Sequence, residues 1–308
     1  MKVEIDISEL KVGHYVVKIA KQLGNFNLAT AGHIKSEKVI NNIKSKQVLS
    51  VLIDESKTIN TSSANDPKTK ISAEVKQAKA IFDESKNIQK SLFSQALSGA
   101  DLDLTPVIGV CNKSIDAIFN NPDSLACIVN IREKDEYLLE HSVAVSVYIT
   151  LFARYLKLDR DIIEQLSIGA FLHDIGKTMI SDEILNKPGK LTDKEFIVMK
   201  THANHSIDII KKIPDVSALS LEVAALHHER LDGTGYPFQV KGKKISRYGR
   251  MISICDIFDA LTATRVYKKG FSHPKAFTIL RDLAQKNHLD AELVDLFIRC
   301  IGVFPIGS

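Results

Sequence analysis

The chain contains 308 residues, of which 44% are hydrophobic and 25% are charged, proportions that are typical of globular proteins and exclude a disordered chain. Its 41 Lys and Arg residues only slightly exceed its 37 Asp and Glu residues, which gives a net charge of +4. So small an excess argues against duplex nucleic acid as a partner, because such binding requires a concentrated basic surface.

The cysteines and the N-terminus indicate a cytoplasmic protein. The four cysteines lie far apart and form no CxxC pair, so we expect reduced thiols, with neither a disulfide framework nor a zinc knuckle. The first ten residues, MKVEIDISEL, carry acidic side chains and lack the apolar segment of a signal peptide. The longest strongly apolar stretch, 142–153, is too short to span a bilayer. We therefore expect no membrane partner.

Short β-type segments predict a small β-rich module over residues 1–60. Apolar and polar residues alternate from Val3 to Ile7, as in a half-buried strand. The runs 15–20 and 48–53 are apolar and rich in β-branched residues, which also favours strands. Between them, 37–46 has the spacing of one short helix.

A linker and connecting helices are expected over residues 61–130. The segment 58–70 is almost free of large apolar residues and contains Asn-Asp-Pro, which is typical of a linker. Apolar residues then recur at helical spacing over 72–97, ahead of Gly99. This helix either packs on its own domain or, because its apolar seam resembles that of a coiled coil, is a signalling helix or one that forms a homodimer.

The remainder of the chain is predicted to be helical. Helical periodicity recurs over 105–119, 137–156, 162–172, 193–211, 221–228, 250–262, 274–285 and 291–300. The fold class expected from these patterns is α+β overall, with a small β-rich N-terminal module followed by an all-α domain.

Five of the ten histidines and two aspartates form an ordered series in the helical part. They are His141, His173, Asp174, His202, His227, His228 and Asp256. Each lies within or at the end of a predicted helix, where burial makes an ionisable group costly unless it is paired or bound to a cation. Imidazole nitrogens and carboxylate oxygens suit Fe, Mn, Zn or Ni better than Mg or Ca. The series therefore predicts a metal centre.

The adjacent ligands favour two ions. Neighbouring helical residues diverge by about 100°, so His173 and Asp174 can address two metals, or one metal from two directions. The two oxygens of Asp174 can bridge two cations, and seven candidates provide about four ligands for each ion when this residue is shared. A single buried His-Asp pair is more often a hydrogen bond of the core, so the interpretation depends on the whole series.

Three segments resemble the HD-GYP family, bacterial phosphodiesterases of the HD superfamily that act on cyclic di-GMP. They are FLHDIGKTMISDEILNKPGKLTDKEF, HHERLDGTGYP and RMISICDIFDALTATRVYKK, in the order that the family has. The resemblance runs from about Lys134 to Pro305 and implies an HD-type helical domain over 131–308. The first 60 or so residues resemble a small module often found ahead of such domains. The chain ends at Ser308, where related proteins often continue, a pattern consistent with C-terminal truncation.

The resemblance also implies which residues hold each ion. One metal would be bound by His141, His173, Asp174 and Asp256, and the other by Asp174, His202, His227 and His228. Some members hold a third metal through a glutamate four residues before the first histidine, but Tyr137 occupies that position here. The resemblance thus implies two divalent transition-metal ions, with iron or manganese as the expected elements.

Further residues are expected to contact substrate. Lys177 follows His173 by four residues and would share its helical face if the helix continued, as a point charge for a phosphate oxygen. The resemblance implies that Asp174 and Lys177 act in catalysis and that Arg265 and Lys268 grip the phosphate or guanine. Both of the latter side chains are alternatively ordinary surface charges.

The loop with Gly235, Tyr236 and Pro237 has the composition of a turn. The resemblance implies that this loop borders the metal site, contacts substrate and binds diguanylate cyclase domains.

These features lead to a mechanistic hypothesis. Two cations about 3.5–4 Å apart would hold a bridging water, lower its pKa and present hydroxide to the phosphorus. Cyclic di-GMP would open to linear pGpG, and a second round would give GMP. Two alternatives stay open: a poorly active module that binds cyclic di-GMP as an effector, and an HD hydrolase acting on cyclic GMP-AMP or another nucleotide.

Overall fold

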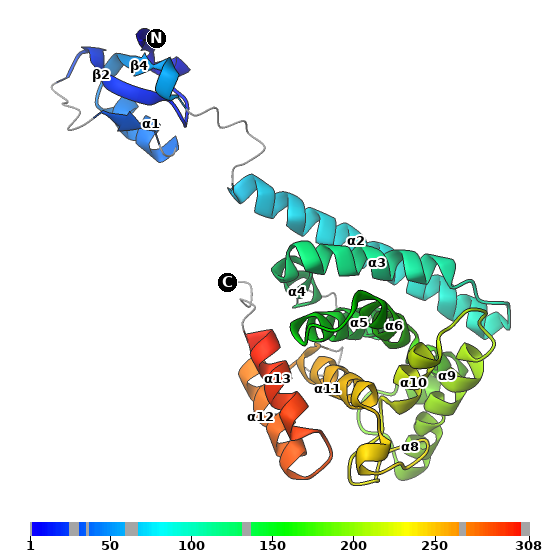
Figure 1. Ribbon diagram of the computed structural model, residues 1–308. Helices are drawn as coiled ribbons and strands as arrows, with labels where there is room; N and C mark the ends of the chain where they lie inside the picture. Colours follow the sequence, from blue (N-terminus) through cyan, green and yellow to red (C-terminus); the bar gives the residue numbers. More distant parts are fainter. Residues whose placement is uncertain are drawn as a thin grey trace. The chain divides into compact units, whose positions relative to one another are not determined.

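The structure, a computed structural model, describes residues 2–24, 31–34, 37–58, 67–130, 137–264 and 269–302. Contacts between residues divide the chain into two compact units, Met1–Ala73 and Glu74–Ser308. Each unit has a hydrophobic core of its own. The first is a small sheet with one α-helix and the second is helical, so the predicted fold class is confirmed (Figure 1).

The first unit contains a four-stranded sheet in the order β1-β4-β2-β3, with antiparallel neighbours throughout. Its elements are β1 (Lys2–Asp6), β2 (Tyr15–Gln22), β3 (Gly32–His33), α1 (Glu37–Ser45) and β4 (Val48–Asp54), with the short 3-10 helices η1 (Ile7–Glu9) and η2 (Glu55–Lys57). Ile40 and Ile43 of α1 share a core with Val51 at the centre of β4. The two-residue β3 was not predicted, because so short a strand has no alternation to detect.

The first predicted strand ends earlier than its alternating pattern suggests. Asp6 accepts a hydrogen bond from the backbone N–H of Ser8 at 2.8 Å and thereby caps η1. Ile7 therefore belongs to this 3-10 helix, since an aspartate that bonds the backbone two residues later favours a turn over an extended chain.

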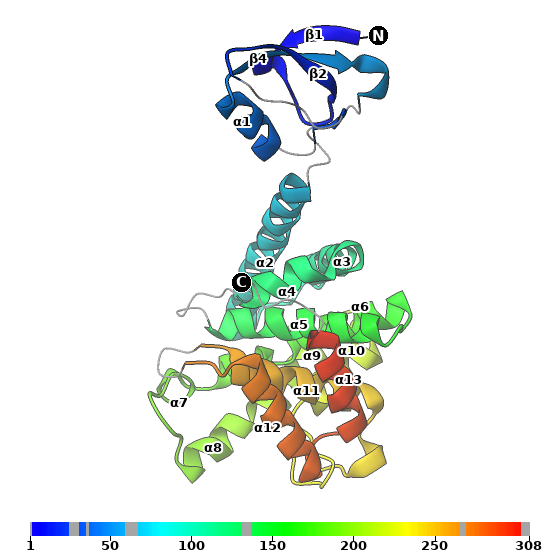
Figure 2. The same cartoon turned by 90° about the vertical axis from the view of Figure 1, so that its left-hand side faces the viewer.

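The second unit is built from helices (Figure 2). Its α-helices are α2 (Pro67–Ser98, which begins before the unit boundary), α3 (Thr105–Asn120), α4 (Pro122–Asn130), α5 (Tyr137–Tyr155), α6 (Arg160–Leu172), α7 (Asp182–Leu185), α8 (Asp193–Lys200), α9 (His202–Ile210), α10 (Ala218–Leu226), α11 (Arg247–Thr262), α12 (His273–Gln285) and α13 (Ala291–Gly302). The 3-10 helices η4 (Ile175–Met179) and η5 (Gly242–Lys244) lie between them. Helix α5 packs against α6 and α11, and α10 packs against the same two helices.

Helices from the predicted connecting segment 61–130 belong to the core of the helical unit. Phe82 of α2, Ile115 of α3 and Leu125 of α4 are buried in the same cluster as the helices that follow. The contact boundary falls between Ala73 and Glu74, so this division assigns α3, α4 and most of α2 to the helical unit.

Aromatic contacts fix α11 against its neighbours. Phe258 of α11 is fully buried, and its ring centroid lies 5.2 Å from that of Tyr148 in α5 and 5.1 Å from that of Phe297 in α13. Edge-to-face pairs of this kind stabilise a core beyond the area they bury. Because α5 and α11 each carry predicted metal ligands, this cluster determines the distance between them.

Two predicted helices end earlier than expected. The single helix expected over 193–211 is two helices, α8 and α9, which meet at Thr201. The helix expected over 221–228 ends at Leu226, so His227 and His228 lie beyond it. Helix α4 was not predicted. None of the α-helices within the described residues is both long enough and apolar enough to cross a bilayer.

Replacing Phe258 with Ala should destabilise the helical unit by about 3–5 kcal/mol, because it leaves a cavity between α5, α11 and α13. The free energy of unfolding can be measured by urea denaturation followed by circular dichroism. Leu97→Ala is the control, since that side chain is 69% exposed and its loss should change the free energy by less than about 0.5 kcal/mol. Equal effects of the two changes would contradict the assigned core.

Candidate metal centre

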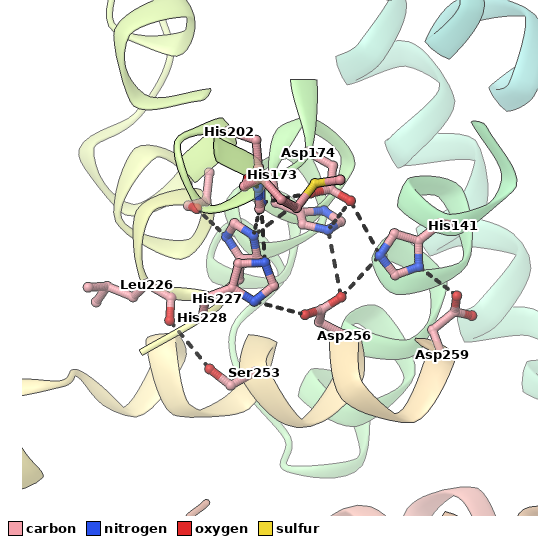
Figure 3. A network of polar contacts seen from close by, with 12 residues as sticks. His141, His173, Asp174, His202, Leu226, His227, His228, Ser253, Asp256 and Asp259 are labelled. Atoms are coloured by element: carbon pink, nitrogen blue, oxygen red, sulfur yellow. Dashed lines mark hydrogen bonds and ion pairs between the residues drawn. The ribbon is translucent and has the colours of Figure 1, made fainter. Parts of the chain in front are cut away.

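Three predicted ligands, His173, His202 and His227, share one local geometry at helix ends (Figure 3). His173 caps the end of α6, His227 caps the end of α10, and His202 follows the end of α8 by two residues. In each, the ring Nδ1 lies 2.6 Å from the backbone carbonyl oxygen three residues earlier. The acceptors are the carbonyls of Ala170, Met199 and Ala224.

This geometry defines the tautomer of each ring. The last carbonyls of a helix have no partner in the helix, and a side-chain donor can satisfy them. A carbonyl only accepts, so Nδ1 must carry the proton and donate it. In the neutral ring the Nε2 lone pair is then free, and it points away from the helix end.

His141 reaches the same arrangement through a carboxylate. Its Nδ1 lies 2.7 Å from Oδ2 of Asp259, which is fully buried on α11. Such a partner orients the ring and directs Nε2 toward a metal. Asp259 was not predicted as a site residue. The available signal was its spacing, since it follows Asp256 by three residues and shares its face of α11.

The carboxylate of Asp174 lies between two groups of imidazoles. Its Oδ2 lies 3.4 Å from Nε2 of His141 and 3.3 Å from Nε2 of His173. Its Oδ1 lies 3.4 Å from Nε2 of His202 and 3.8 Å from Nε2 of His227. Each oxygen therefore faces a different pair of rings, which is the geometry that a bridging carboxylate requires.

Asp256 also faces both groups. Its Oδ1 lies 3.0 Å from Nε2 of His141, and its Oδ2 lies 3.6 Å from Nδ1 of His228. The resemblance assigns Asp256 to one ion alone. In the structure, however, its Oδ2 faces His228, which is a predicted ligand of the second ion.

The side chains present fit a pair of cations. The ligand atoms of His202, His227 and His228 lie within 4.8 Å of one another, and so do those of His141, His173 and Asp174. Nε2 of His202 lies 3.4 Å from Nε2 of His227, although both nitrogens carry lone pairs. In addition, Nε2 of His173 and Oδ1 of Asp174 are buried without a hydrogen-bond partner among the described residues. A cation in each group would satisfy these atoms and remove the repulsion.

Burial keeps the second group of rings neutral. It lowers the pKa of His202 to about 4 and that of His228 to about 3. It also lowers the pKa of His227 well below its ordinary value, with a further contribution from His228. At pH 7 these rings therefore accept a cation without first losing a proton.

His141 behaves differently because carboxylates surround it. Burial alone would lower the pKa of His141, but hydrogen bonds to Asp256 and Asp259 raise it to about 9. Burial would likewise raise the pKa of Asp174, yet the neighbouring His173 and Lys177 hold it well below its usual range. The protein without a cation thus holds a proton on His141 at neutral pH.

The helix on which Lys177 would share the face of His173 does not continue as far as this lysine. Helix α6 ends at Leu172, and Lys177 lies in η4, where residues three apart are eclipsed. Its Nζ accordingly lies 2.5 Å from Oδ2 of Asp174, with 17% of the lysine side chain exposed. Lys177 is a neighbour of the Asp174 carboxylate, and its contact with substrate stays a prediction.

Gly176 allows η4 to approach α9 closely. A Cβ atom there would overlap the carbonyl oxygen of His202 and the backbone nitrogen of Ser206. The N–H of Gly176 donates to Oγ of the buried Ser206 at 2.8 Å. This contact holds Asp174, two residues earlier, at a defined distance from His202.

The predicted substrate loop folds against the same ligands. Gly235 is buried, and a Cβ atom there would overlap the backbone of Glu229 and Arg230. Tyr236 donates its N–H to the carbonyl of His228 at 3.2 Å, and its ring centroid lies 4.6 Å from that of His228. Pro237 follows through a cis peptide bond.

Glu229 supports this loop through hydrogen bonds to its backbone. It was not predicted as a site residue. Only 2% of it is exposed, and its Oε1 accepts hydrogen bonds from the N–H groups of Phe238 at 2.7 Å and Gln239 at 3.0 Å. Burial raises its pKa above the ordinary value despite these bonds. Its place directly after His227 and His228 was the one available signal.

The structure brings all seven predicted ligands together. Arg265 and Lys268 lie outside the described residues, so their contact with substrate stays a prediction.

Comparison with known proteins identifies the family of the helical unit. Residues 126–293 match a family described as HD domain, and residues 2–107 match a domain of unknown function, DUF3391. A cyclic di-GMP phosphodiesterase of Pseudomonas aeruginosa is 35% identical over 236 residues, which are 76% of this chain and 56% of that protein. A 3'3'-cGAMP-specific phosphodiesterase of Vibrio cholerae is 42% identical over 164 residues, which are 51% of this chain and 35% of that protein.

A solved structure shares the fold. A HDG"Y"P protein from Bdellovibrio bacteriovorus superposes with a TM-score of 0.62 and 16% identity, and the match covers 98% of this chain and 100% of that chain. The chain spans 56% of the length of the Pseudomonas aeruginosa relative and 35% of the length of the Vibrio cholerae relative.

Asp259→Asn should lower the affinity for Mn²⁺ by about 10- to 100-fold, because an amide orients the His141 ring less strongly than a carboxylate. Calorimetric titration of the metal-free protein measures this affinity. Circular dichroism should show an unchanged helix content, and an affinity equal to that of the wild type would contradict the orienting role.

Mn²⁺ binding at pH 7 should release a proton from His141, because the ring is protonated below a pKa of about 9 and a ligand must be neutral. The apparent affinity should therefore rise from pH 7 to pH 9 and then level off. Calorimetry in buffers of different ionisation enthalpy counts the protons. Proton release that does not change over this range would contradict the assignment.

Proposed function

Since the chain belongs to the HD domain family, we propose that it is a metal-dependent phosphodiesterase that hydrolyses cyclic di-GMP. The observation that carries this proposal is the shared carboxylate of Asp174, whose two oxygens face different groups of imidazole nitrogens. Two metal-binding groups that share one ligand suit the cleavage of a phosphodiester. The name of the Pseudomonas aeruginosa relative supports cyclic di-GMP as the substrate.

The proposed cofactors are two divalent transition-metal ions, iron or manganese. His141, His173, Asp174 and Asp256 would hold one, and Asp174, His202, His227 and His228 the other. The mixture of imidazole nitrogens and carboxylate oxygens supports these metals over Mg or Ca. Bound cations supply Lewis-acid polarisation of the phosphoryl oxygens and lower the pKa of water.

The residues of the chain have separate tasks in this proposal. The carbonyls at the helix ends orient the rings of His173, His202 and His227, so no reorganisation of these rings is needed when substrate binds. Lys177 holds a positive charge beside Asp174 and would offset the negative charge that develops on the phosphoryl oxygens. The products would be linear pGpG and, after a second cleavage, GMP.

Cyclic GMP-AMP is the second candidate substrate. A specific observation favours it, namely the 42% identity to a 3'3'-cGAMP-specific phosphodiesterase. An effector that only binds cyclic di-GMP is less well supported, because the chain retains every predicted ligand.

Binding of diguanylate cyclase domains through the Gly235–Pro237 loop, a homodimer through α2 and a cytoplasmic location stay predictions. Phe238 at the end of that loop is 55% exposed, which would leave it accessible to a partner.

Asp174→Asn should lower turnover of cyclic di-GMP by more than about a hundredfold. Loss of a residue that only orients a ligand costs about 10- to 100-fold, and Asp174 carries a charge that both groups of imidazoles share. Turnover is measured by chromatography of pGpG with Mn²⁺-loaded protein. Asp116→Asn is the matched control, since that carboxylate is 61% exposed in a surface pair with Arg160. Full activity in Asp174→Asn would refute the proposal.

A further inference from the structure

The candidate metal centre opens to solvent at one ligand. The side chain of His228 is 25% exposed. The side chains of the other predicted ligands are at most 8% exposed. His228 is therefore the predicted ligand that is most accessible to a substrate, and the groups beside its ring are placed to contact one.

An aromatic and cationic rim lies beside His228. The ring of Tyr236 is 4.6 Å from that of His228, at an interplanar angle of 38°. Nζ of Lys200 lies 5.9 Å from the centroid of the Tyr236 ring and 5.3 Å from that of Phe196. Phe196 and Lys200 are one turn apart on α8, and Phe196 is 48% exposed. These three residues connect the open ligand to the surface.

Phe196 and Lys200 contribute little to the fold. A phenyl ring that is nearly half exposed contributes little to a core, and Lys200 has no carboxylate partner among the described residues. A cation held between two rings retains ammonium protons that can be donated to an acceptor.

We propose that Phe196, Lys200 and Tyr236 form a guanine-binding subsite. The inference rests on the proposed function and extends it to the recognition of the base. Exposed aromatic rings bind nucleobases by stacking, which tolerates any base. Lysine donates to the adjacent O6 and N7 acceptors of guanine, whereas adenine carries an amino donor in place of O6. Phe196 thus supplies affinity, and Lys200 selects guanine over adenine.

The test compares two substrates with the full Mn²⁺-loaded chain. Phe196→Ala should lower kcat/KM for cyclic di-GMP and cyclic di-AMP alike, by about tenfold. Lys200→Met should lower kcat/KM for cyclic di-GMP by about tenfold and that for cyclic di-AMP by clearly less, because adenine shares only the N7 acceptor. Ile197→Ala is the control on the same helix, since its side chain is 60% exposed and it should change neither value. Thermal melting should be unchanged in all three variants.

An equal loss for both substrates in Lys200→Met, or no loss in Phe196→Ala, would overturn the subsite. Should the wild type hydrolyse neither substrate, the proposed function fails, and calorimetric binding of GMP and AMP then decides the subsite by itself. Lys200→Met should weaken GMP binding by about tenfold and AMP binding by clearly less. Unchanged GMP binding would refute the inference, and it would leave the rim as a surface for a protein partner.

Discussion

One hydrogen bond, made three times, organises the candidate metal centre. An imidazole Nδ1 donates to the backbone carbonyl three residues earlier, at the ends of α6, α8 and α10. The bond satisfies a carbonyl at the helix end, defines the ring tautomer and directs Nε2 toward the candidate metal centre. The same hydrogen bonds therefore serve both the helix ends and the orientation of the predicted ligands. The remaining contacts, from Asp259 to His141 and from Gly176 to Ser206, adjust the spacing of ligands that are already aimed.

The same bond explains what could be predicted from the sequence and what could not. The residue types of the ligands and their order along the helices indicated a metal centre, because imidazoles and carboxylates beside apolar residues require a partner. Periodicity could not locate the break at Thr201 or the early end of α10, because side chains take the carbonyls there. Asp259 and Glu229 were missed for a related reason: their roles depend on partners that are remote in sequence or in a loop.

A buried ion pair joins α2 to α5, the helix that carries the predicted ligand His141. Nζ of Lys86 on α2 lies 3.4 Å from Oε1 of Glu140, and Glu140 is only 2% exposed. Glu140 directly precedes the ligand His141 on α5. Removing one partner of such a pair leaves a buried charge, which is strongly destabilising. The position of α2 is therefore part of what holds α5, and with it one of the seven predicted ligands.

Three successive side chains have three different attachments. His227 bonds the end of α10, His228 lies beside the ring of Tyr236, and Glu229 accepts a hydrogen bond from the loop that follows Tyr236. These attachments are joined covalently, with no intervening residue to absorb a displacement. Two predicted ligands and the acceptor that supports the Tyr236 loop therefore come from one uninterrupted stretch of three residues, so the loop and the ligands share a single point of attachment to α10.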